Sequence, residues 1–242
     1  MRQFLPRTVL GLALVALVVA FLPGTRATAA SWTSTCATGS FCLYDQDGGQ
    51  GAALAADPTA PVQGLDATWN DRARSVDNQS SYWACFYADA SYGGTVQAVR
   101  PGGQADLAEL GTRLDGKVTS FKGAKSKAGC FTGYERCATG QLCLFAEESG
   151  RGAMTALTDD EVTTFGADWN GRAASVFNHT AKHACFYPNP GLAGSWTANG
   201  STYRAFVVLS GDSTFVPAPY AGTLSSDRLV TASGGRPATD FC

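Results

Sequence analysis

The sequence predicts an all-β protein made of two tandem Greek-key β-sandwich domains, and three observations support this prediction. One irregular stretch occurs twice, as WNDRARSVDNQSSYWACFYADASYGG from Trp69 and as WNGRAASVFNHTAKHACFYPNPGLAG from Trp169. Short alternating apolar runs, bounded by Gly, Asn, Asp and Pro, fill both copies and are typical of strands joined by tight turns. Apolar residues at the helical period of about 3.6 are nearly absent. A small β domain has therefore been duplicated.

The first 29 residues are predicted to be a secretory signal peptide outside the fold. Arg2 and Arg7 precede an apolar run of fourteen residues, Val9 to Leu22, and residues 27–29 have the small side chains of a cleavage site. The run is shorter than the roughly 20 residues of a membrane span, so a retained N-terminal anchor is the less favoured alternative. We expect a secreted, extracellular protein with no membrane association once the signal is removed.

The charge of the mature chain is negative. Loss of the signal removes three of the 18 basic residues and leaves 15 against 20 acidic ones, a net charge of about −5. No cluster of Lys and Arg is present, which argues against nucleic acid or an anionic membrane as a partner. The remaining length suits two small domains. We expect the signal peptide at residues 1–29, the first domain at 30–133 and the second domain at 134–242.

The eight cysteines repeat with the duplicated stretch and predict four disulfides, two in each domain. No close Cys-x-x-Cys pair occurs, so a zinc site is not expected. Four cysteines allow three pairings in each domain. We favour Cys36–Cys42 with Cys85–Cys130, and Cys137–Cys143 with Cys185–Cys242.

A hairpin pattern recurs twice in each domain: an aromatic residue, four further residues, an anchor, one residue and a glycine. In the clearest example Tyr87 is followed by Tyr92 and Gly94. We expect the aromatic ring to pack across a folded hairpin, and the glycine to have a positive φ or a position where a side chain would clash. The other examples begin at Tyr44, Phe145 and Tyr187 and end at Gly51, Gly152 and Gly194.

A second signature, WN-x-R-x-x-SV, follows the first hairpin of each domain. It comprises Trp69, Asn70 and Ser75 in the first domain, and Trp169, Asn170 and Ser175 in the second. LDGKVTSF from Leu114 and, weakly, GTLSSDRL from Gly222 take its place after the second hairpins. The Ser and the apolar residue after it predict a turn that enters a fourth strand, so two four-strand units make each Greek-key domain. Residues 105–114 (ADLAELGTRL) are the one candidate for a short helix.

The hairpin pattern followed by Asn/Asp-Asn/Asp-x-x-Ser/Thr-Ser resembles the βγ-crystallin Greek-key pair. The fuller pattern, Cys-x5-Cys, WN-x-R-x-x-SV-x-N and CFY, resembles the secreted bacterial peptidase-inhibitor family built on that fold, whose founding members inhibit metalloproteinases. The resemblance covers nearly the whole mature chain, twice. It implies two tandem βγ-crystallin-like domains, each with two disulfides. It also implies a secreted, monomeric, non-enzymatic inhibitor of an extracellular protease, specifically a metalloprotease.

An inhibitor of this kind presents an exposed loop in rigid form, which lowers the entropy lost on docking. No stretch matches a reactive loop of the family closely enough to be carried over. By length and composition the candidates are residues 55–68, 100–116 and 195–226. The last is about twelve residues longer than its counterpart, so we expect the two domains to bind differently.

Calcium is the one cofactor to weigh, because many βγ-crystallin domains bind it through oxygen ligands. Asn70 and Asp71 suit such a site, but Arg74 stands where Ser or Thr is expected, and Gly116 follows Asp115. A weak calcium site in the first domain is one interpretation, and side chains that only cap turns are the favoured one. No site is expected in the second domain, and no other cofactor is expected.

Catalytic residues are scarce. The two histidines, His179 and His183, both belong to the second domain, and we expect them at the surface. A Ser-His-Asp or Cys-His mechanism is therefore excluded in the first domain. The hairpin-tip carboxylates have nothing near them to raise their pKa; they are Asp45, Asp47, Glu147 and Glu148. The alternatives to an inhibitor are an extracellular structural or calcium-binding module, and a toxin-like or cell-wall-binding protein.

Overall fold

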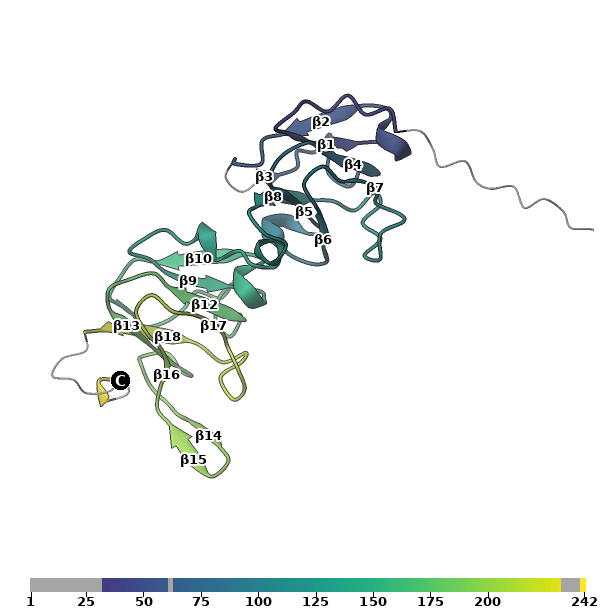
Figure 1. Ribbon diagram of the computed structural model, residues 1–242. Coiled ribbons are helices and arrows are strands. Elements are labelled where there is room, and N and C mark those ends of the chain that lie inside the picture. Colours follow the sequence, from purple (N-terminus) through teal and green to yellow (C-terminus); the bar gives the residue numbers. More distant parts are fainter. Residues whose placement is uncertain (1–31, 61–62, 232–239) are drawn as a thin grey trace, which may run out of the picture. The chain divides into compact units, whose positions relative to one another are not determined.

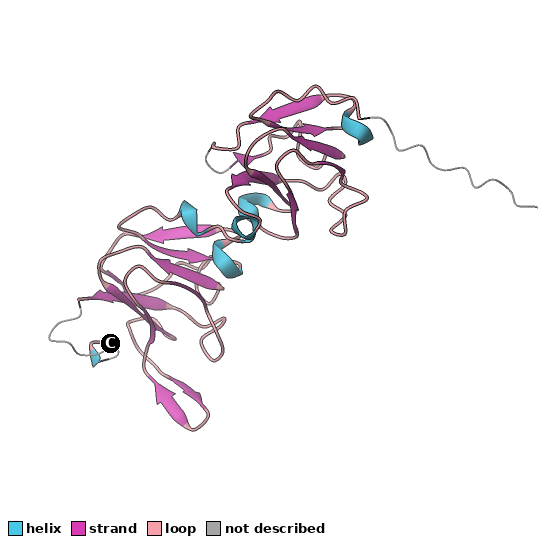
Figure 2. Cartoon of the chain, viewed as in Figure 1, coloured by secondary structure: helices cyan, strands magenta, loops and turns pink. Residues whose placement is uncertain are grey.

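The computed structural model describes residues 32–60, 63–231 and 240–242, and the predicted signal peptide lies outside these ranges. The chain from Ser31 to Cys242 forms one compact unit. Within the described ranges, no helix is long and apolar enough to cross a membrane. The regular structure of this part consists of strands and short 3-10 helices (Figure 2).

The first half contains two four-stranded antiparallel sheets (Figure 1). Their strands are β1 (Phe41–Tyr44), β2 (Ala53–Ala56), β3 (Gln63–Gly64), β4 (Ser75–Asn78), β5 (Trp83–Tyr87), β6 (Val96–Val99), β7 (Gln104–Asp106) and β8 (Ser120–Ala124). The sheet orders are β2-β1-β4-β7 and β3-β8-β5-β6. Each sheet takes one edge strand from the other four-strand unit, since β7 pairs with β4 and β3 pairs with β8. This exchange locks two Greek-key units into one sandwich.

The second half repeats this topology. Its strands are β9 (Leu142–Phe145), β10 (Met154–Leu157), β11 (Glu161–Val162), β12 (Ser175–Asn178), β13 (His183–Tyr187), β16 (Phe206–Val208), β17 (Ser213–Phe215) and β18 (Ser226–Val230). The sheet orders are β10-β9-β12-β17 and β11-β18-β13-β16. The prediction of two tandem βγ-crystallin-like Greek-key domains is therefore confirmed.

The helical segments are single turns. They are η1 (Asp47–Gly49), η2 (Ala90–Tyr92), η3 (Ala128–Phe131), η4 (Tyr134–Arg136) and η5 (Glu148–Gly150). The prediction of a short helix at residues 105–114 is wrong, because this segment holds the end of β7 followed by tight turns. Leu107 and Leu114 both point into the core and are buried. The two leucines are seven residues apart, which is the spacing of two helical turns. In the structure, tight turns rather than a helix bring both side chains into the core.

An extra hairpin distinguishes the second half. Equivalent residues are 100 apart at Ala84 and Ala184, but 109 apart at their strand partners Val99 and Val208. Nine additional residues therefore lie between β13 and β16, and they form β14 (Trp196–Ala198) and β15 (Ser201–Tyr203) as a separate two-stranded sheet. Ser120 and Ser226 are 106 apart, so three residues are lost again before β18. The net lengthening up to β18 is six residues, which corrects the expected twelve.

Each half has its own apolar core between its sheets. In the first half the Phe41 ring meets Phe86 and Phe121 edge to face, with centroids 5.8 and 5.5 Å apart. Such edge-to-face geometry is favoured by the aromatic quadrupole. In the second half Phe186 packs near Phe165 at 6.5 Å. Along β5 the side chains alternate between two buried clusters, with Ala84 and Phe86 in the core and Cys85 and Tyr87 on the opposite face.

All eight cysteines are paired. The bridges are the favoured ones: Cys36–Cys42, Cys85–Cys130, Cys137–Cys143 and Cys185–Cys242. The longer bridges span 45 and 57 residues and tie β5 and β13 to the segments that follow the last strands. Closing loops of this length removes a large part of the conformational entropy of the unfolded chain.

Candidate functional site

The serine of the second signature fastens a hairpin tip. Ser75 lies beside Tyr44 in the β4–β1 ladder. Its hydroxyl donates to the Gln46 carbonyl at 2.6 Å and accepts from the Gly49 N–H at 3.0 Å. The equivalent hydroxyls of Ser120, Ser175 and Ser226 make the same two contacts with their own hairpins. The signature recurs because each hairpin needs this hydroxyl.

The hairpin aromatics and glycines have the packing expected of them. The rings of Tyr87 and Tyr92 lie 5.0 Å apart and both are buried. Gly94 has a φ of +69°, and a Cβ there would lie 2.5 Å from a carboxylate oxygen of Asp89. Only glycine fits such a position without strain. Positive φ also occurs at Gly51, Gly152 and Gly194, while Tyr44 and Tyr187 are buried.

The repeated tryptophans are structural. Trp69 is buried in the first core, and Trp169 is half-buried against the second. The signature arginine covers each ring, with the Arg72 guanidinium 5.3 Å from Trp69 and the Arg172 guanidinium 5.6 Å from Trp169. These stacking contacts cover the ring faces, so neither indole is a free platform for a ligand.

The asparagine that ends each signature was not singled out as a structural residue from the sequence. Asn78 and Asn178 are fully buried. The Asn78 amide donates to the carbonyls of Tyr82 and Val99 at 2.8 and 3.1 Å. Its oxygen accepts from the Ser80 hydroxyl at 2.7 Å. Buried amide groups need hydrogen-bond partners, and these contacts supply them. The recurrence of SV-x-N in both copies was the one sequence signal for this structural role.

The proposed calcium ligands of the first half are held by internal partners. The Arg74 guanidinium lies 3.2 Å from the Asp115 carboxylate. Asp71 accepts from the Asn70 amide at 3.0 Å and from the Thr119 hydroxyl at 3.3 Å. Within residues 32–60, 63–231 and 240–242, no group of three His, Cys, Asp or Glu side chains is placed to hold a metal ion. A guanidinium at this position repels a cation, so the residues do not fit calcium.

The histidines are half-buried with hydrogen-bond partners, which differs from the expected surface position. The ring of His179 stacks on Phe177 with centroids 4.7 Å apart, and its Nδ1 lies 3.0 Å from the Cys137 carbonyl. His183 Nδ1 accepts from the Ser210 N–H at 3.1 Å. The Nε2 of His179 also lies 3.4 Å from the Thr139 hydroxyl. These contacts tie each ring to its own half of the chain.

The hairpin-tip carboxylates are also used within the fold. Asp45 pairs with Arg72 at 2.5 Å, and this hydrogen bond lowers the pKa of Asp45. Glu147 accepts from the Gly94 N–H at 3.1 Å. Asp47 and Glu148 are exposed. The lowered pKa of Asp45 is the opposite of what a general acid would need.

Two of the three candidate loops are folded onto their own sheets. In residues 55–68, Pro58 is buried, and its carbonyl oxygen would lie 2.2 Å from a Cβ at Gly123. Residues 61 and 62 lie outside the described ranges. In residues 100–116, tight turns place Leu107 and Leu114 in the core. Both segments also contribute to edge strands of their own sheets, since residues 55 and 56 end β2 and residues 104–106 form β7.

The third candidate, residues 195–226, holds a projecting hairpin and several exposed apolar side chains. Figure 1 shows β14 and β15 extending away from the sheets of their own half. Tyr203, Leu209 and Phe215 have exposed fractions of 40%, 45% and 55%. Three of the four large apolar side chains with the highest exposure among the described residues belong to this segment, and the fourth is Phe131.

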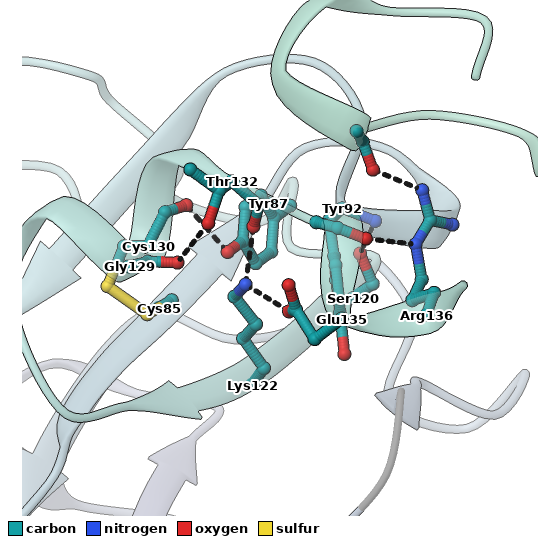
Figure 3. Close-up of polar contacts among 12 residues, drawn as sticks. Cys85, Tyr87, Tyr92, Ser120, Lys122, Gly129, Cys130, Thr132, Glu135 and Arg136 are labelled. Carbon is teal, nitrogen blue, oxygen red and sulfur yellow. Dashed lines mark hydrogen bonds and ion pairs between the residues drawn. A yellow bond between two sulfur atoms is a disulfide. The ribbon is translucent and has the colours of Figure 1, made fainter. Parts of the chain in front are cut away.

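A cavity of about 710 Å³ lies beside β8 and η4. Lys122, Arg136 and Tyr92 line it, and we call these three side chains the clamp. The Lys122 ammonium pairs with the Glu135 carboxylate and donates to the Thr132 carbonyl (Figure 3). Lys122 and Arg136 both lie over the Tyr92 ring, at 4.8 and 5.4 Å from its centroid. Arg136 donates to three main-chain carbonyls. These cations are matched within the chain, so the clamp is structural.

A comparison of the sequence with profiles of known protein families identifies the family of this chain. The profile of peptidase inhibitor family I36 matches residues 29–99 and 132–199, more than half of the chain. The chain belongs to this family. No curated protein matches it. Similar solved structures include Geodin, a βγ-crystallin from Geodia cydonium (14% identity, 80% of this chain and 99% of that chain, TM-score 0.36), and protein S complexed with calcium (17% identity, 79% and 99%, TM-score 0.30).

The ends of the two I36 matches can be placed in the fold. The first ends at Val99, the last residue of β6. The second ends at Asn199, at the tip of the β14–β15 hairpin. The two matches thus end 100 residues apart, and the nine additional residues of the second half lie between β13 and β16.

Proposed function

We propose that this chain is a secreted inhibitor of extracellular metalloproteases that acts as a monomeric, rigid binder. The observation that carries the proposal is the I36 match in both halves, residues 29–99 and 132–199. Under this proposal residues 1–29 are the signal peptide, and the working domains are residues 30–133 and 134–242.

The rigidity of the fold supports this mode of action. Four disulfides and four serine-fastened hairpins hold the surface segments in one conformation. A binder that is already ordered loses less conformational entropy on docking, so more of its contact energy appears as affinity. The same rigidity resists unfolding into the active site of a protease, which protects the inhibitor from digestion.

A titration tests the proposal directly. The mature protein is added to a fixed concentration of a thermolysin-like metalloprotease, with a serine protease in parallel. We expect residual metalloprotease activity to fall linearly to a sharp equivalence point, with little effect on the serine protease. Full activity of the metalloprotease beside intact, excess protein would overturn the proposal and favour a structural or cell-wall-binding role.

A further inference from the structure

We infer that the β14–β15 hairpin is the element that enters the protease cleft, and that only the second half inhibits. This inference rests on the proposed function and names the contact surface within it. The hairpin is the largest structural difference between the halves, because nine residues are added between β13 and β16. A contact made through it cannot be reproduced by the first half.

The hairpin is anchored at its base by aromatic side chains. The Trp196 ring meets the Tyr220 ring edge to face with centroids 4.8 Å apart, and the Phe206 ring stacks on Tyr220 at the same centroid distance of 4.8 Å. The Trp196 indole N–H donates to the Thr223 hydroxyl at 2.8 Å, and Tyr203 also lies 6.2 Å from Tyr220. A two-stranded hairpin is marginally stable alone. These contacts hold it in one conformation, so docking requires little further ordering.

Among the residues that the structure describes, no strand covers either outer edge of the hairpin. Neither β14 nor β15 pairs with another strand in the described part of the chain. Ala198 and Ser201 flank the two-residue loop, and the next pair is Thr197 with Thr202. In this register the flanking pair exchanges its hydrogen bonds, so the N–H and C=O groups of Thr197 and Thr202 point outward. An extended polypeptide or an enzyme edge strand can pair with them by β-augmentation.

The chemistry of the hairpin suits a protease cleft. A peptidase holds the segment that it cleaves in extended form through main-chain hydrogen bonds, and a free strand edge offers the same groups. Residues 195–203 carry no charged side chain, so the hairpin enters the cleft without desolvating a charge.

The tip protects the hairpin from cleavage. Asn199 and Gly200 have φ values of +51° and +76°, as in a tight two-residue hairpin turn. This left-handed turn cannot be drawn into the extended form that cleavage requires without breaking the hairpin. We therefore expect the hairpin to remain uncut in the complex.

Proline substitutions test the edge pairing. Thr202→Pro removes one outward N–H and leaves the cross-strand bonds of the neighbouring residues in place, whereas Thr202→Ala keeps the N–H. We expect Thr202→Pro to raise the inhibition constant against the metalloprotease at least about tenfold, and Thr202→Ala to change it less than about twofold. The unaltered chain should bind one protease per molecule. Near-ultraviolet circular dichroism of each variant verifies that the Trp196–Tyr220 packing persists.

A length-matched deletion provides the second arm. Removal of residues 196–204 gives the β13–β16 connection the same length as the β5–β6 connection, and we expect complete loss of inhibition with both halves still folded. Inhibition retained by Thr202→Pro and by the deletion would overturn this inference alone. Absence of inhibition by the unaltered chain would overturn the proposed function and the inference with it.

Discussion

Asp227 occupies in the second half the core position that Phe121 occupies in the first. Phe121 lies opposite Phe86 in the β5–β8 ladder, and Asp227 lies opposite Phe186 in the equivalent β13–β18 ladder. Asp227 is fully buried, and neither of its carboxylate oxygens has a hydrogen-bond partner within the described residues. Burial, together with the nearby charges of Asp159 and Glu161, raises the pKa of Asp227 to about 8.

The stability of the protein should fall as the pH rises from about 4 to about 8. The ordinary pKa of the carboxyl is 3.8, so the folded protein holds the Asp227 proton more tightly than the unfolded chain does. The stabilising contribution is complete below the ordinary pKa and is lost as the pH rises through the folded one. The slope is at most about 1.4 kcal/mol per pH unit. Asp227→Asn should flatten the Tm-against-pH curve in this window.

The exposed Asp168 supplies the control, because Asp168→Asn should leave the slope unchanged. Thermal unfolding followed by circular dichroism at several pH values measures both variants. If the unaltered chain and Asp227→Asn have the same slope, Asp227 does not titrate in this window.

The pair between Lys122 and Glu135 should matter more than an exposed ion pair. The side chain of Lys122 is only 7% exposed, while that of Glu135 is 51% exposed. Burial lowers the pKa of Lys122, and Glu135 partly opposes this. Glu135→Gln leaves a buried ammonium without its counter-charge and should reduce the free energy of unfolding by about 1–3 kcal/mol in urea titrations.

The exposed pair Lys182–Asp160 is the matched comparison. Asp160→Asn should change the free energy of unfolding by less than about 0.5 kcal/mol, because water screens this pair. Equal effects of the two substitutions would show that Lys122 is hydrated in solution.

The signature serines should each contribute to stability through the hairpin that they fasten. Ser75→Ala leaves the N–H of the buried Gly49 without its acceptor. The loss should be about 1–3 kcal/mol in the free energy of unfolding. Ser175→Ala should behave alike, since Ser175 accepts from Gly150 at 3.0 Å. Ser195→Ala, at an exposed position, is the control, and a comparable loss there would contradict the hairpin-fastening role.

Calcium should not stabilise the protein. The Arg74 guanidinium neutralises Asp115 at the place where a cation would bind. A ligand that binds only the folded state raises Tm as its concentration exceeds the dissociation constant. We expect the same Tm with 1–5 mM calcium, roughly the range of weak extracellular sites, and with a chelator. A calcium-dependent rise would show that Arg74 moves aside and that the rival calcium-binding role deserves a test.

Much of the fold could be predicted because its signals are local or internal to the chain. The aromatic-to-glycine hairpins and the repeated cysteines can be compared between copies without any knowledge of contacts. The partners of Asn78 and His179 could not be predicted, because they are main-chain carbonyls that only the folded backbone brings within hydrogen-bond distance. The helix predicted at residues 105–114 was wrong because tight turns, which the apolar spacing does not reveal, place Leu107 and Leu114 in the core.

The sequence by itself determined the number of domains, the order of their hairpins and the eight cysteines, because duplication and strand periodicity are properties of neighbouring residues. Only the tertiary structure decided which segment completes the second sheet. If the two halves are aligned with a constant offset of 100 residues, Trp196 corresponds to Val96 of β6. In the structure, however, Phe206–Val208 pairs with β13, and the residues before it form the separate β14–β15 hairpin. It also placed Asp227 in the core. Strand pairing and burial depend on contacts between residues far apart in the chain, so they cannot be predicted from local sequence patterns.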